Sequence, residues 1–199
     1  DEFFMIRVGS LFDIMALKEE TVDNKTGMTA REQLEKIYQA VRPLYVQREL
    51  LFNQIELLLR HYGVSRLTPR ELESTERKFI KNYFRNNINP VLSPQIIDTH
   101  HPFPHFQNKV NHVCAMLRHK NKEVFGVVPA PSSLPGIIFL PGNDVRYIRL
   151  EDILQEYLPD IFSMYSVLES VQLCITRNGD IHTDENVVDV DLDFRNKMK

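Results

Sequence analysis

Glycine is scarce in this chain of 199 residues, which has only seven. Loops that cradle phosphate through backbone N–H groups need closely spaced glycines, as in the patterns G-x-x-x-x-G-K-[ST] and G-x-G-x-x-G. Neither pattern occurs in the sequence. The chain therefore carries no phosphate-binding loop of the P-loop or dinucleotide type.

Cysteine is also rare, with Cys114 and Cys174 as the two examples. Neither belongs to a C-x-x-C pair, so the sequence gives no support for a zinc or redox site. Each lies within an apolar run, which predicts two buried free thiols. Nothing in this cysteine usage indicates an oxidising compartment.

Long apolar runs and a strong charge imbalance are missing as well. No run approaches the ~20 apolar residues that a membrane-spanning helix needs, and the start of the chain has no basic segment typical of a signal peptide. The net charge of -3 provides no global field for nucleic acid. We expect a soluble protein without a transmembrane segment or nucleic-acid partner, located in the cytoplasm or, alternatively, at the membrane periphery.

The first half of the chain has helical periodicity. We expect one helix over residues 1–19, a second from the capping box Thr29-x-x-Glu32 to Gly63, and a third from the capping box Thr68-x-x-Glu71 to residue 89. Pro43 is expected to kink the second helix. Three amphipathic helices with short links favour an antiparallel three-helix bundle over residues 1–87, truncated at its start.

The pattern changes near residue 88, where Pro and Gly become frequent and apolar residues begin to alternate. The expected elements are hairpins over 110–128 and 137–148, a helix over 150–157, a strand over 167–177 and a helix over 184–199. Residues 88–199 should therefore form an α+β domain, an antiparallel β-meander with packed helices. The domain boundary is expected at residues 86–90.

Three histidines lie close together at His100, His101 and His105. Pro102 and Pro104 exclude a regular helix there, so the spacing does not match a helical metal-binding pair. An extended loop whose histidines cap backbone groups or face solvent is the alternative to a metal site, and we assign no metal ligands in this chain.

Two arginines could contact phosphate, because a guanidinium binds phosphate through two parallel hydrogen bonds. Arg177 should follow a strand and precede an Asn-Gly turn. Arg7 should lie on the first helix, opposite its apolar stripe. For both residues the alternative is an ordinary surface position, with Arg177 paired to a carboxylate and Arg7 in solvent.

Several short motifs of the chain, in this order, resemble signatures of the bacterial polyphosphate kinase family. They are Asp1-Glu2-Phe3-Phe4 with Arg7-Val8, Asn89-Pro90-Val91-Leu92-Ser93-Pro94, Asp98 with His101-Pro102-Phe103-Pro104, Leu150-Glu151-Asp152-Ile153 with Leu158-Pro159 and Phe162, and Thr176-Arg177-Asn178 with Asp180. The resemblance covers nearly the whole chain and implies the N-terminal and middle domains of such an enzyme.

The resemblance carries expectations about function. Enzymes of this family transfer the terminal phosphate of ATP to polyphosphate, reversibly, through a phosphohistidine and with Mg²⁺. Their helical N-terminal domain helps to cover the adenine ring, and the middle domain contributes to dimerisation and to the wall of the polymer tunnel. The catalytic histidines belong to C-terminal domains, so none of the seven histidines here inherits that role.

We therefore expect ATP or ADP and polyphosphate as ligands of the full-length protein, a homo-oligomer, no catalytic residue in this chain, and Arg7 and Arg177 as substrate-binding residues. Two other functions remain open from the residues. One is a non-enzymatic protein–protein interaction module, which an exposed apolar groove without nearby bases would favour. The other is a metal-dependent hydrolase, which would need the three clustered histidines to converge.

Overall fold

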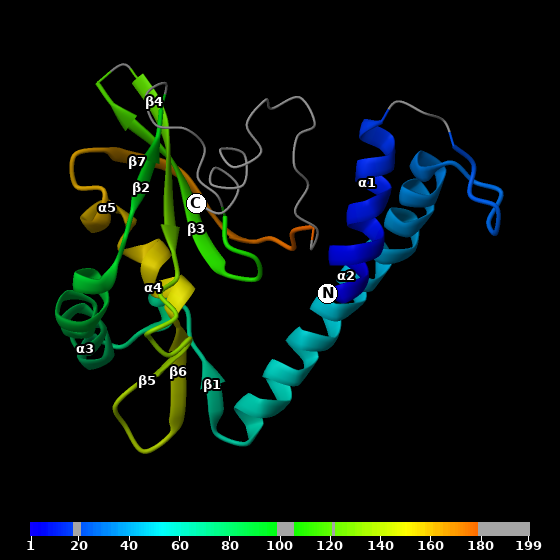
Figure 1. Ribbon diagram of the computed structural model, residues 1–199. Coiled ribbons are helices and arrows are strands. Elements are labelled where there is room, and N and C mark those ends of the chain that lie inside the picture. The colour runs from blue at the N-terminus through cyan, green and yellow to red at the C-terminus, as the bar shows by residue number, and fades with distance from the viewer. Residues whose placement is uncertain (18–20, 99–105, 121, 179–199) are drawn as a thin grey trace. The chain divides into compact units, whose positions relative to one another are not determined.

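The computed structural model describes residues 1–17, 21–98, 106–120 and 122–178 (Figure 1). Its described part divides into two compact units. One contains Asp1–Leu51 together with residues 176–178, and the other is Phe52–Ile175. The helix α2, Ala30–His61, contributes residues to both units.

The first unit is helical. A π-helical turn, Phe4–Val8, runs directly into α1, Gly9–Ala16. Its small core joins these elements to the start of α2, with four buried side chains, those of Val8, Leu11, Ala30 and Leu34. The expected first helix is thus present, and it packs against the second one.

Local sequence signals set both ends of α2. At its start the Thr29 backbone N–H donates to Glu32 Oε2 at 2.8 Å, and the Glu32 N–H donates to Thr29 Oγ1 at 3.3 Å, which is the predicted capping box. At its end Gly63 has a φ of 77°, the left-handed conformation that suits glycine after a helix. The helix continues through Pro43.

The segment after α2 differs from the expected single helix. The capping box of Thr68 and Glu71 forms as predicted, but it opens only a short 3-10 turn, Pro69–Glu71. Leu72 then adopts an extended conformation, and a second capping box of Glu73 and Glu76 opens α3, Ser74–Tyr83. Because a second capping box follows the first, α3 starts at Ser74, later than the capping box of Thr68 and Glu71 predicts. It continues into a π-helical turn, Phe84–Ile88, and a 3-10 turn, Asn89–Val91.

Four antiparallel strands form the larger sheet of the second unit, in the order β2-β4-β3-β7. They are β2, Gln95–Ile97; β3, Asn111–His119; β4, Lys122–Pro129; and β7, Ser166–Cys174. The β3–β4 hairpin and the late strand β7 confirm the predicted elements. Their pairing differs from a simple meander, because β7 returns to lie beside β3.

The smaller sheet has the order β1-β6-β5. The predicted second hairpin is confirmed as β5, Ile137–Phe139, paired antiparallel with β6, Val145–Arg149. Sequence patterns did not predict β1, Val64–Arg66. This strand follows α2 directly and pairs parallel with β6. Two short helices, α4, Leu150–Glu156, and α5, Leu158–Ile161, follow β6 and confirm the expected helical segment.

The expected three-helix bundle is not confirmed. The buried residues of the third helical segment, including Ile80, Phe84 and Ile88, belong to the main core of the second unit. That core also contains Val113 and Leu117 of β3 and residues of α4. The apolar side of α3 thus packs against the sheets, because a sheet face offers it more apolar surface than the four-residue core of the first unit.

The described residues contain no helix that is both long enough and apolar enough to cross a membrane. The helix expected over residues 184–199 lies outside the described residues. The division into domains of residues 1–87 and 88–199 stays a prediction, while the compact units of the structure divide between Leu51 and Phe52.

Candidate functional site

Arg7, the first predicted substrate-binding residue, contacts polar groups of the first unit. Its Nη2 donates to Gln33 Oε1 at 2.6 Å and lies 3.4 Å from Asp23 Oδ2. The Arg7 side chain is nevertheless 43% exposed. This guanidinium thus links the first helix to α2 and to the loop before it, while part of it faces solvent.

Asp23 organises that loop. Its Oδ1 accepts hydrogen bonds from the backbone N–H groups of Thr26 at 2.9 Å and Lys25 at 2.8 Å. These two bonds hold the pKa of the Asp23 carboxyl below its ordinary value of 3.8, with a smaller contribution from Arg7. The loop is therefore an anchored turn that presents a carboxylate to Arg7.

Arg177, the second predicted residue, follows β7 as expected and is partly buried. Its neighbour Asn178 contacts α1, where the Asn178 Nδ2 donates to Asp13 Oδ2 at 2.8 Å. The two ends of this contact are 165 residues apart in sequence. Residues 176–178 belong to the same compact unit as Arg7. The structure thus places both predicted arginines in the first unit, Arg7 in the turn that leads into α1 and Arg177 next to the residue that contacts α1.

A polar network that sequence patterns missed lies in the second unit. Arg149 binds Asp152 through two hydrogen bonds, with Nε–Oδ2 at 3.0 Å and Nη2–Oδ1 at 2.7 Å. Gln172 of β7 accepts from Arg149 at 3.0 Å and donates to Asp152 at 2.8 Å. The spacing Arg-x-x-Asp at a helix start was the one available signal.

These contacts explain the ionisation of the pair. Burial acts to raise the pKa of Asp152, but hydrogen bonds from Arg149 and Gln172 outweigh it, so the pKa lies below the ordinary value. The hydrogen bond to Asp152 raises the pKa of Arg149. Because the charges and hydrogen bonds are matched internally, the network fastens α4 to β7 and leaves little capacity for a ligand.

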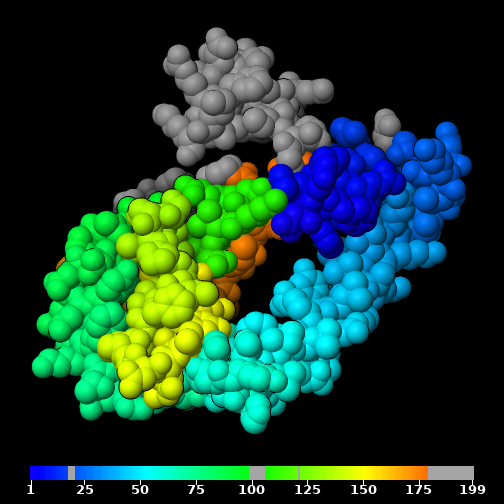
Figure 2. All heavy atoms as spheres, turned by 90° about the horizontal axis from the view of Figure 1, so that it is seen from below, coloured from blue at the N-terminus to red at the C-terminus, as the bar shows by residue number. Residues whose placement is uncertain are grey.

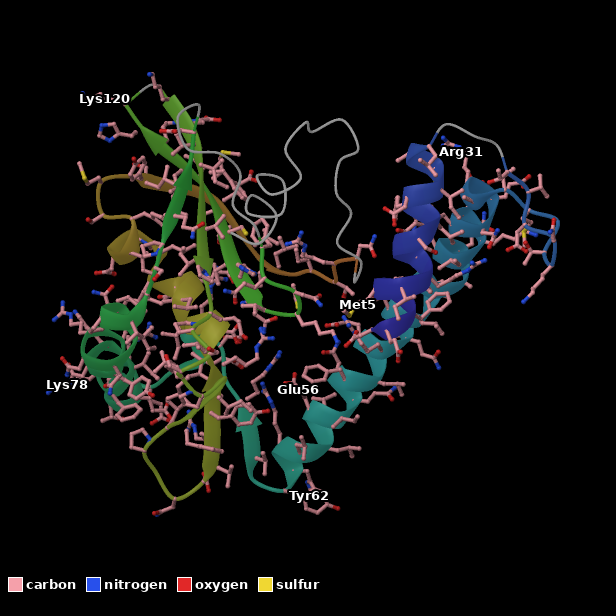
Figure 3. The ribbon with its side chains drawn as sticks, in the orientation of Figure 1. Met5, Arg31, Glu56, Tyr62, Lys78 and Lys120 are labelled. Atoms are coloured by element: carbon pink, nitrogen blue, oxygen red, sulfur yellow. The ribbon has the colours of Figure 1, made fainter. Side chains whose placement is uncertain are left out.

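The end of α2 is attached to β1 by a second ion pair. Arg66 Nε lies 2.7 Å from Glu56 Oε1, and the Arg66 guanidinium lies over the Phe52 ring, 5.1 Å from its centroid. Figure 3 labels Glu56 on the side of α2 toward β1 and Tyr62 at the helix end. This arrangement fixes the last turns of α2 within the second unit.

A shallow pocket of about 480 Å³ opens near α4. Its lining residues are Thr68, Pro69, Arg70, Asp152, Gln155 and Glu156. One arginine faces two carboxylates, so the charge of this lining does not favour a phosphate chain. We do not assign the pocket to substrate.

The prediction that both cysteine thiols are buried is confirmed for one of them. Cys114 is buried in β3, and burial raises the pKa of its thiol. Cys174 is exposed, contrary to the prediction, because it lies at the end of the edge strand β7. The thiol of Cys174 is therefore the accessible one.

The histidine cluster at His100, His101 and His105 lies outside the described residues. Among the residues that the structure does describe, no group of three or more His, Cys, Asp or Glu side chains is arranged to hold a metal ion.

The fold matches a solved enzyme. The crystal structure of polyphosphate kinase from Porphyromonas gingivalis superposes with a TM-score of 0.72 over 92% of this chain and 28% of that one, at 20% identity. This likeness shows the fold.

Sequence comparison identifies the family. The polyphosphate kinase N-terminal domain matches residues 1–67, and the polyphosphate kinase middle domain matches residues 75–199. The polyphosphate kinase of Bacillus anthracis is 36% identical over 190 residues, and that of Prosthecochloris aestuarii is 32% identical over 200 residues. These alignments cover 91% and 94% of this chain. The chain belongs to the polyphosphate kinase family.

The chain spans about a quarter of the length of these relatives, 27% of the Bacillus anthracis protein and 28% of the Prosthecochloris aestuarii protein. The Asn178–Asp13 contact joins the residues after β7 to α1, the helix that directly follows the segment 1–8.

Proposed function

We propose that this chain forms the N-terminal and middle domains of an enzyme that transfers the terminal phosphate of ATP to polyphosphate through a phosphohistidine. The observation that carries the proposal is the match of both domains, in order, to the polyphosphate kinase family. In this proposal Mg²⁺ and the phosphorylated histidine are held mainly by the rest of the enzyme, as the family resemblance implies; among the described residues no three His, Cys, Asp or Glu side chains group to hold a metal ion.

In this proposal the chain itself is non-catalytic. It covers the nucleotide, lines the polymer tunnel and supports a dimer. Phosphoryl transfer depends mainly on positioning and electrostatic stabilisation, so a domain without catalytic residues can still change the rate strongly. The predicted contacts with polyphosphate are Arg7 and Arg177, whose unit also carries the first motif.

Arg7 and Arg177 differ in what their surroundings allow. Arg7 already binds Gln33 and Asp23, so a phosphate oxygen would have to compete with a carboxylate for one edge of its guanidinium. Arg177 is partly buried beside the Asn178–Asp13 contact. The test uses Arg177, because replacing Arg7 would also remove the hydrogen bonds that Arg7 donates to Gln33 and Asp23.

The test compares the full-length enzyme with its Arg177→Gln and Lys78→Gln variants. Both changes remove one positive charge, and Lys78 is an exposed residue of α3 whose side chain is labelled in Figure 3. We expect Arg177→Gln to weaken polyphosphate binding by about tenfold, as for loss of one charge-assisted hydrogen bond. Its affinity should also depend less steeply on salt.

Calorimetric titration with long-chain polyphosphate at low and moderate salt measures both quantities. Lys78→Gln should match the unmodified enzyme. If the two variants weaken binding equally, Arg177 has no specific role. A purified chain of residues 1–199 should make no polyphosphate from ATP and Mg²⁺ while the full-length enzyme does, and polymer formation by that chain would refute the assignment of catalysis elsewhere.

One observation favours a second role, docking against protein. The second half of α2 exposes several apolar side chains: Leu57 and Leu58 are 70% and 63% exposed, and Tyr62, the residue after the helix, is 79% exposed. In Figure 2 the cyan segment that ends α2 lies at the surface that faces the viewer. A group of large exposed apolar side chains on one segment is typical of an interaction surface.

We assign this surface to the remainder of the full-length polypeptide, because about three quarters of each relative's length lies outside the aligned region. In that case Leu58→Glu lowers the melting temperature of the full-length enzyme, whereas the exposed polar residue Gln54 of the same helix tolerates Gln54→Glu. An unchanged melting temperature for Leu58→Glu would instead favour an external protein partner.

A further inference from the structure

The contact between α1 and the segment after β7 is built from three residues. Gly9 and Asp13 lie four residues apart on α1 and therefore on one side of the helix. Asn178 donates its side-chain amide to Asp13 Oδ2 at 2.8 Å. Its side chain also lies directly over Gly9, where an added methyl group would come within 2.6 Å of Asn178 Cγ.

A side chain at this helical position would displace the Asn178 side chain from its place on α1. Gly9 has ordinary right-handed helical dihedrals, so its backbone conformation does not demand glycine. Any Cβ would instead occupy the space of the Asn178 amide group. The absence of a side chain at Gly9 makes a notch in α1, and the Asp13 carboxylate provides a hydrogen-bond acceptor beside it.

We propose that Asn178 is a positioning residue that seats in the Gly9–Asp13 notch and thereby orients Arg177 for contact with polyphosphate. The inference rests on the role proposed above for Arg177. Consecutive Cα atoms are about 3.8 Å apart, so an anchored Asn178 limits where the backbone of Arg177 can lie. An arginine already held in place loses less conformational entropy when the polymer binds.

Three substitutions in the full-length enzyme separate the parts of the contact. Gly9→Ala fills the notch without changing charge. Asn178→Asp keeps the shape of the side chain but places a carboxylate against Asp13. Asp13→Asn combined with Asn178→Asp restores one donor and one acceptor with the original net charge. Gly136→Ala is the matched control, because a methyl group there meets nothing within 4 Å.

The KM for polyphosphate and kcat are measured for each variant, together with the melting temperature. We expect Gly9→Ala and Asn178→Asp to raise the KM by about fivefold or more with kcat little changed, which is the signature of lost uniform binding. The double variant should return to within about twofold of the unmodified enzyme, as expected for a restored pair. Gly136→Ala should leave the KM unaltered.

A double-mutant cycle that combines Gly9→Ala with Arg177→Gln distinguishes positioning of Arg177 from a general effect on the stability of the fold. If Asn178 acts through Arg177, adding Gly9→Ala to Arg177→Gln raises the KM no further, whereas a general structural effect would add to it. Should Gly9→Ala not fold, Asn178→Asp adds no volume and provides the same comparison.

The two proposals fail in different ways. If Arg177→Gln raises the KM but Gly9→Ala and Asn178→Asp do not, the positioning role is wrong and the role of Arg177 stands. If Arg177→Gln itself has no effect, the proposed substrate contact is wrong, and the positioning role falls with it. Additive effects in the combined variant also overturn the positioning role.

Discussion

Gly126, in the middle of β4, should not tolerate even one additional methyl group. It pairs with Ala115 of β3 and Ile96 of β2, inside the larger sheet. A Cβ at this position would lie 2.6 Å from Leu117 Cδ1 and 2.9 Å from Phe162 Cζ. Ordinary contacts of this kind are 3.4–4 Å, so both neighbours must move by several tenths of an ångström or more.

Both neighbours are enclosed by the core. Leu117 is fully buried and Phe162 is 4% exposed, and both belong to the main core. Adding a methylene to a well-packed core costs about 1–3 kcal/mol. Gly→Ala changes also stabilise by about 0.4–1 kcal/mol through the unfolded state where the site is open. That second effect is shared with Gly136→Ala, which meets no neighbouring atoms.

The difference between Gly126→Ala and Gly136→Ala therefore isolates the packing cost, about 1–3 kcal/mol. For a chain of this size each kcal/mol corresponds to roughly 2–4 °C in melting temperature. Chemical denaturation with urea, followed by far-ultraviolet circular dichroism, measures the same difference as a shift in the midpoint. Gly126→Ala should have the lower midpoint, and Gly136→Ala should equal or exceed the unmodified chain.

A second pair of measurements tests the mechanism. Leu117→Ala removes the atoms nearest to the new methyl group, and by itself should cost about 2–5 kcal/mol. In that background, Gly126→Ala should cost much less than it does alone, because the methyl group enters vacated space. Equal midpoints for the two glycine variants, or an unchanged cost of Gly126→Ala beside Leu117→Ala, would refute this account of the packing.

Two further predictions concern the thiols and a buried histidine. In the native chain the exposed Cys174 should react with a thiol reagent such as DTNB, while the buried Cys114, whose pKa is raised, should react only after unfolding; two fast-reacting thiols would contradict the burial. Burial lowers the pKa of His112 below its ordinary value of 6.5, with an opposing hydrogen bond to the Val110 carbonyl. As the pH falls, the unfolded state binds this proton before the folded state does, so the free energy of unfolding should decrease below about pH 6.5. His112→Gln should make the free energy of unfolding depend less on pH between pH 7 and pH 5. Urea midpoints across that range measure it, and an equal slope in the variant would assign the effect to other groups.

Sequence reasoning located most of the local structure, because the responsible interactions lie within a few residues. Thr29 with Glu32 and Thr68 with Glu71 close their capping boxes as predicted. The hairpins β3–β4 and β5–β6 form where alternating apolar residues flank turn residues. Gly63 ends α2 in the left-handed conformation that the sequence pattern indicated.

Packing between distant elements was not predictable in the same way. The apolar stripe of α3 shows that one side of the helix is buried, but not against which partner. The structure places Ile80 and Phe84 in the core with the sheets, and the expected three-helix bundle is not confirmed. Likewise, the capping box of Glu73 and Glu76 follows so closely on that of Thr68 and Glu71 that the start of α3 was assigned too early.

By itself the sequence determined the local turns, caps and hairpins, and the motifs that place the chain in the polyphosphate kinase family, since all of these depend on the order of neighbouring residues. Only the tertiary structure decided the parallel pairing of β1 with β6, the exposure of Cys174 and the seating of Asn178 on Gly9 and Asp13. These features join residues far apart in the chain, and their partners are selected by the shape and apolar area of complete surfaces. The spacing of apolar residues indicates which side of a helix or strand is buried, and the tertiary structure determines which elements cover that side.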